Sequence, residues 1–107
     1  MIEVSVFLNQ EEKISGFQVT GHSGTAPRGS DIVCAGVSSL AQTALLGIGE
    51  HLHREVEYSV ASGKLWMNLK RDPDDLTEAI LQTMLLGMRE IEKLKPKAVR
   101  IKKVQVT

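Results

Sequence analysis

A histidine and the only cysteine of the chain lie twelve residues apart, with a glycine-containing stretch between them. His22 follows Gly21, and Cys34 ends the run Asp31-Ile32-Val33-Cys34. A cysteine attacks as its thiolate, which needs a proton acceptor and a positive local field. A nearby imidazole can supply the acceptor, and the N-terminus of a helix can supply the field. His22 and Cys34 are therefore a candidate pair for covalent catalysis.

We expect Cys34 to lie in the first turn of a helix that is capped by Ser30 or Asp31. The unpaired backbone N–H groups of such a turn stabilise an anion, and those of Cys34 and Ala35 are candidates for an oxyanion hole. Cys34 would attack a peptide carbonyl to form an acyl-enzyme, while His22 would act first as base and then as acid. The other interpretation is that both residues are structural, because cysteine is often buried as a small hydrophobe.

The hydrophobic pattern predicts the strands and helices that hold this pair. Apolar residues alternate before and after the pair, as in half-buried strands, and recur near every 3.6 residues in two longer segments, as in helices. We expect strands at about 2–8, 13–22, 55–60, 65–69 and 98–106, and helices at about 31–54 and 73–94. A bulge is expected near Gly16, where the alternation breaks. The segment Ser23–Ser30 is a predicted loop, in which Gly24 and Gly29 would let the chain open and close over a substrate.

The order ββαββαβ predicts an α+β fold, with a mostly antiparallel sheet packed with two helices. At 107 residues the chain is expected to form a single domain, 1–107, with a modest core. Aromatic residues make up only 4% of the chain, so aliphatic side chains and methionine must fill that core. Met84 and Met88 are expected there.

Composition bears on partners and location. The formal net charge is zero, so the overall field does not favour nucleic acid or an anionic membrane. We expect no signal peptide, no apolar run of about 18 residues and no membrane span. A single cysteine cannot form an internal disulfide, which is consistent with the reducing cytoplasm.

The motif around the pair resembles a known signature. Gly21-His22-Ser23-Gly24, then Gly29, then the run from Asp31 to Ser38 is similar to the signature of the ribosomal-processing cysteine protease family Prp. The chain length and the element order also agree. Ser23 stands where that family usually has alanine, and Gly36 occupies a position that is often alanine, so both changes replace one small residue by another.

The resemblance implies an activity and its residues. It implies a cytoplasmic cysteine endopeptidase, without a cofactor, that removes the N-terminal extension of the twenty-seventh large-subunit ribosomal protein. It also implies a homodimer and a cleft with an apolar wall, and it assigns catalysis to His22 and Cys34. Asp31 and Ser38 match motif positions too. Asp31 is a helix cap or a third catalytic member, and Ser38, one turn after Cys34, faces the same cleft or serves helix packing.

The sequence leaves a second function open, RNA binding, and disfavours a third, metal binding. A basic cluster near the C-terminus suggests a ribosome-associated RNA-binding module without catalysis, or else a solvated surface. The cluster consists of Lys93, Lys95, Lys97, Arg100, Lys102 and Lys103. Paired aromatic residues for base stacking are not evident, which argues against direct nucleic-acid binding. His51 and His53 are two residues apart and would lie on different helix faces, so we expect no metal site there.

Overall fold

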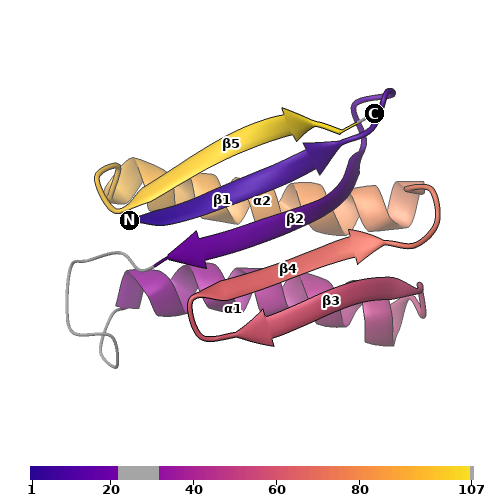
Figure 1. The fold of residues 1–107 in the computed structure, drawn as a ribbon, viewed down its shortest axis with the longest axis horizontal. Helices are drawn as coiled ribbons and strands as arrows, with labels where there is room; N and C mark the ends of the chain where they lie inside the picture. Colours follow the sequence, from indigo (N-terminus) through magenta and orange to yellow (C-terminus); the bar gives the residue numbers. More distant parts are fainter. Residues whose placement is uncertain (22–31, 107) are drawn as a thin grey trace.

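A computed structural model describes residues 1–21 and 32–106 (Figure 1). Within these ranges the order of elements is the expected ββαββαβ. The strands are β1 (Ile2–Leu8), β2 (Ile14–Gly21), β3 (Val56–Ala61), β4 (Lys64–Leu69) and β5 (Val99–Gln105), and the helices are α1 (Ile32–Leu46), η2 (Gly47–His51) and α2 (Asp75–Leu94). The predicted α+β fold class is confirmed.

The five strands form one mixed sheet in the order β3-β4-β2-β1-β5. The β1–β2, β2–β4 and β3–β4 pairs are antiparallel, whereas β1 and β5 are parallel. The expected bulge is present: Phe7 pairs with Gly16 and Leu8 with Ile14, so Ser15 is the additional residue. Its hydroxyl donates to the carbonyl of Phe7 over 3.3 Å.

Both helices cover the same face of the sheet, α1 behind β3 and β4 and α2 behind the other strands (Figure 1). The core lies between the sheet and this helical layer. Aliphatic side chains dominate it, and Met84 and Met88 are buried there as expected. The largest fully buried side chains are Phe17, Ile2, Ile14, Ile48, Met67, Leu81 and Met88. Within residues 1–21 and 32–106 no helix covers the other face of the sheet (Figure 1). Trp66 belongs to that face, because it lies between Leu65 and Met67 of β4, which are buried on the core side.

The helical segment that contains Cys34 differs from the expectation in two ways. It does not continue as an α-helix to residue 54, because the chain widens into a π-helix at Gly47–His51, where two glycines weaken the regular helix. Its composition also departs from the expectation of no apolar run of about 18 residues. The segment Ile32–His51 has a mean hydropathy of 1.6 and, by length and composition alone, is long and apolar enough to span a membrane. Its buried side chains, which include Val37, Ala41 and Ile48, pack in the core.

The second helix begins at a capping box. The carboxylate of Asp74 accepts hydrogen bonds from the N–H groups of Leu76 and Thr77, and the Thr77 hydroxyl accepts one from the N–H of Asp74. Arg54, next to the start of β3, also donates to the Asp74 carboxylate over 2.8 Å. This hydrogen bond, more than any other contact, lowers the pKa of Asp74. The cap therefore joins the end of the first helical region to the start of α2.

Candidate active site

Cys34 lies in the first turn of α1, as the sequence predicted. It is two residues beyond Ile32, where the helix begins, and its side chain is half-buried against the core. The first turn of Ile32–Leu46 has no acidic side chain. Within this segment, therefore, no carboxylate lies in the turn that carries the sulfur, and the positive end of the helix dipole lies at that turn.

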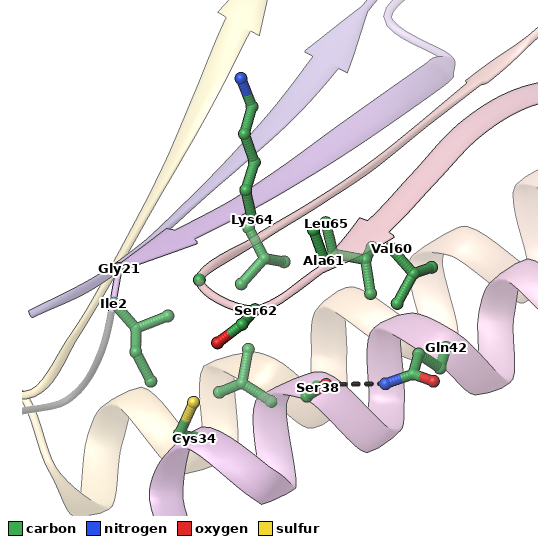
Figure 2. A pocket seen from close by; sticks show the side chains of 13 residues that line it. Ile2, Gly21, Cys34, Ser38, Gln42, Val60, Ala61, Ser62, Lys64 and Leu65 are labelled. Atoms are coloured by element: carbon green, nitrogen blue, oxygen red, sulfur yellow. Dashed lines mark hydrogen bonds between the residues drawn. The ribbon is translucent and has the colours of Figure 1, made fainter. Parts of the chain in front are cut away.

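The sulfur faces a pocket of about 330 Å³ between α1 and the end of the sheet. Figure 2 shows the sulfur pointing from α1 toward the β3–β4 turn, with Ser62 opposite it. Apolar side chains dominate the lining, and among the described lining residues only Lys64 is charged. The full lining is Ile2, Val19, Gly21, Cys34, Val37, Ser38, Gln42, Val60, Ala61, Ser62, Gly63, Lys64 and Leu65. A pocket of this kind suits an uncharged peptide segment.

Ser38 lines the same pocket as Cys34, one helical turn along α1. Its hydroxyl accepts a hydrogen bond of 2.8 Å from the side-chain amide of Gln42. Positions 34, 38 and 42 are four residues apart, so their side chains lie along one face of the helix. Figure 2 shows the three in a row along α1, with Cys34 near Ser62 of the β3–β4 turn and Gln42 near Val60. Ser38 therefore borders the pocket of Cys34, while the choice between a role in the cleft and helix packing stays a prediction.

Gly21 ends β2 directly before His22 and lines the pocket as well. Its φ of 88° lies in the left-handed region, which favours glycine. Its N–H donates to the carbonyl of Gly63 over 3.0 Å, which joins the end of β2 to the β3–β4 turn. The described chain therefore reaches the rim of the Cys34 pocket at the residue that precedes the predicted base.

Four of the predicted site residues lie outside the described residues: His22, Gly24, Gly29 and Asp31. The pairing of His22 with Cys34, the substrate loop and the cap of α1 therefore remain predictions. Cys34 and Ser38 are the predicted site residues that the structure describes, and both line one pocket.

Sequence reasoning missed the contribution of the second hairpin. Val60, Ser62 and Gly63 all line the Cys34 pocket, although they follow the cysteine by more than 25 positions. The strands expected at about 55–60 and 65–69 left a turn between them, so the turn itself agrees with the sequence analysis. Its position beside Cys34 results from the pairing of β4 with β2, and no local pattern in the sequence indicates that pairing.

Metal chemistry finds no support in the part of the chain that the structure describes. No three side chains among the histidines, cysteine, aspartates and glutamates of residues 1–21 and 32–106 come together as a ligand set. His51 ends the π-helix and His53 lies beyond it with a φ of 56°.

A cysteine at the start of a helix, facing a largely apolar pocket in a small α+β domain, is the arrangement of a cysteine protease. Three comparisons with known proteins agree. The family model described as "Cysteine protease Prp" matches residues 1–100. The chain is 30% identical over 95 residues to the ribosomal processing cysteine protease Prp of Staphylococcus aureus, which covers 86% of this chain and 89% of that protein.

Solved structures show the same similarity. One is the essential ribosomal processing protease Prp from S. aureus in complex with a covalently linked product peptide, with a TM-score of 0.89 and 27% identity over 96% of this chain and 99% of that one. The same S. aureus protease with a substrate peptide has a TM-score of 0.85 and 26% identity over the same shares of the two chains. SMU.848 from Streptococcus mutans, at 22% identity, shares the fold with a TM-score of 0.83, over 99% of this chain and 96% of that one. This chain belongs to the Prp family of cysteine proteases.

Proposed function

We propose that this protease removes the N-terminal extension of the twenty-seventh large-subunit ribosomal protein and so supports ribosome assembly. The observation that carries the proposal is the position of Cys34 in the first turn of α1, facing a mostly apolar pocket. The name of the S. aureus relative, a ribosomal processing protease, supports a ribosomal protein as the substrate.

The chemistry follows from the thiol and the proposed base. His22 takes the proton of Cys34, and the thiolate attacks the carbonyl carbon of the scissile bond. The N–H groups at the start of α1 stabilise the resulting oxyanion. His22 then protonates the departing amine, which leaves an acyl-enzyme on the sulfur. Water, deprotonated by the same imidazole, releases the extension and restores the thiol.

Mass spectrometry of the ribosomal protein with its extension, incubated with each variant, tests the proposal. Cys34→Ala and Cys34→Ser should fold normally and lose cleavage, because neither supplies a thiolate. His22→Ala should lose most of the rate and still bind the uncut extension. His51→Ala is the matched control, since it removes an exposed imidazole at the far end of the helical segment that begins at α1. Substantial cleavage by Cys34→Ala would disprove covalent catalysis by this thiol.

We also propose that the protease is a cytoplasmic homodimer that acts without a cofactor, a membrane or direct contact with nucleic acid. The zero net charge of the chain supports the last point. So does the position of the basic cluster, which is spread over the end of α2 and the edge strand β5. Lys93 of that cluster already pairs with Glu90 over 2.8 Å. Lysines on an edge strand also deter association with other strands.

A further inference from the structure

The two edges of the sheet differ in whether their outward backbone N–H groups have hydrogen-bond partners. At the β5 edge, the N–H of Ile101 donates to the carboxylate of Glu92 over 3.0 Å, and the N–H of Val99 donates to the carbonyl of Lys95 over 3.2 Å. The helix α2 and its C-terminal end thus satisfy two amides of β5. At the opposite edge, β3 pairs with β4 alone, and within residues 1–21 and 32–106 no strand lies on its outer side.

The hydrogen-bonding pattern identifies which amides of β3 face outward. The N–H of Lys70 donates to the carbonyl of Glu55 over 3.1 Å, just before the first ladder pair. Antiparallel neighbours alternate between hydrogen-bonded and non-hydrogen-bonded pairs. Counting from Glu55, position 59 faces β4, whereas the N–H and C=O groups of Tyr58 and Val60 point to the outer edge. Unpaired groups of this kind form a template for another strand.

The side chains of the same two residues face the helical layer. Tyr58 pairs with Met67 and Val60 with Leu65, and both partners are buried on the core side of the sheet. Side chains of directly paired residues lie on the same face. Tyr58 and Val60 nevertheless remain 58% and 49% exposed. Together, Tyr58 and Val60 form an exposed apolar patch at the edge of the sheet, the β3 patch.

The β3 patch borders the pocket of Cys34. Val60 lines the same pocket as Cys34, and Figure 2 shows it above Gln42, two helical turns along α1 from the cysteine. The pocket is therefore bounded on one side by the helix face with Cys34, Ser38 and Gln42, and on the other by the end of β3. The end of the β3 edge and the sulfur therefore border one pocket, so an extended chain that followed this edge would lead toward Cys34.

We propose that the substrate binds as an added strand on the outer edge of β3. The inference rests on the proposed proteolytic function and specifies how the substrate is held. The backbone of an extended peptide pairs with the outward N–H and C=O groups of Tyr58 and Val60, in the strand-addition mode of peptide recognition. Alternate side chains of the peptide face α1 and contact the β3 patch. The substrate class is thus an unfolded segment with apolar residues at alternating positions.

A proline substitution tests the backbone pairing. Tyr58→Pro removes an N–H that the β3–β4 ladder does not use, and proline is tolerated on edge strands. Tyr58→Thr is the matched control, because it removes the ring and keeps both the N–H and a residue suited to strands. With a synthetic peptide that spans the extension and the cut, kcat/KM of the proline variant should fall roughly tenfold below that of the threonine variant. Equal values for two variants that melt as cooperatively as the wild type would overturn strand addition.

Amide exchange gives a second test that does not depend on the proline variant folding. In Cys34→Ala with the same peptide bound, the amides of Tyr58 and Val60 should exchange at least several-fold more slowly, while that of Ile101 at the other edge should not change. Unchanged exchange at Tyr58 and Val60, with cleavage by the wild type intact, would overturn strand addition and leave the proposed function standing. A wild-type enzyme that does not cleave the peptide would overturn the proposed function, and the inference with it.

Discussion

Replacing Gly21 with alanine should destabilise the domain and damage the site together. Gly21 ends β2 with a φ of 88°, a conformation in which a side chain approaches the backbone. A Cβ built there would also overlap the carbonyl oxygen of Met1, beside Ile2, which pairs with Gly21. That oxygen belongs to the backbone at the start of β1, so relief of the overlap requires a shift of the chain and not of a flexible side chain.

The two effects set the magnitude. A left-handed backbone costs a residue with a Cβ about 1–2 kcal/mol, and overpacking typically costs about 1–3 kcal/mol more. We therefore expect the free energy of unfolding to fall by about 2–5 kcal/mol, and Tm to fall by roughly 10–30 °C for a domain of this size. The hydrogen bond from the N–H of Gly21 to Gly63 should weaken as well, since the end of β2 moves.

Urea and thermal unfolding measure the first effect, and cleavage at a temperature where the variant is fully folded measures the second. We expect kcat/KM to fall even in the folded variant, because Gly21 directly precedes the proposed base, His22. Gly49→Ala is the matched control, since no heavy atom lies within 4 Å of a Cβ built there. It should leave stability unchanged or raise it by up to about 1 kcal/mol. A Gly21→Ala variant as stable and active as Gly49→Ala would refute this reasoning.

Three further predictions concern the core, the helix cap and the nucleophile. Met88→Ala removes a fully buried side chain and should lower the free energy of unfolding in urea by about 2–5 kcal/mol. The lowered pKa of Asp74 implies stability that is present above its unfolded value of 3.8 and is lost as pH falls through the lower folded value. Asp74→Asn should flatten that acid limb in urea titrations, and an unchanged limb would contradict the assignment. Iodoacetamide should add one adduct, at Cys34, and abolish cleavage, whereas cleavage by the fully alkylated protein would exclude a role for the thiol.

Much of the fold follows from local patterns in the chain. Alternating apolar residues predicted the strands to within about two positions, because β1, β2 and β4 each bury side chains of one face against the helices. The break in alternation near Gly16 predicted the bulge. The end of the first helix was predicted less well, because residues such as Ala44 and Gly47 are compatible with both α- and π-helical geometry. The same small and apolar residues also make Ile32–His51 resemble a membrane span, and only its packing in the core distinguishes the two.

The candidate nucleophile and its local setting follow from the amino-acid chain alone, since Cys34 is the only cysteine and lies at the start of a helix that the local pattern predicts. The tertiary structure alone decided what faces that sulfur. The pairing of β4 with β2 brings Val60 and Ser62 to Cys34, and the strand order leaves the edge of β3 open beside them. These contacts join segments distant in the chain, so they depend on strand order and register, which the burial of whole faces sets and short motifs do not encode.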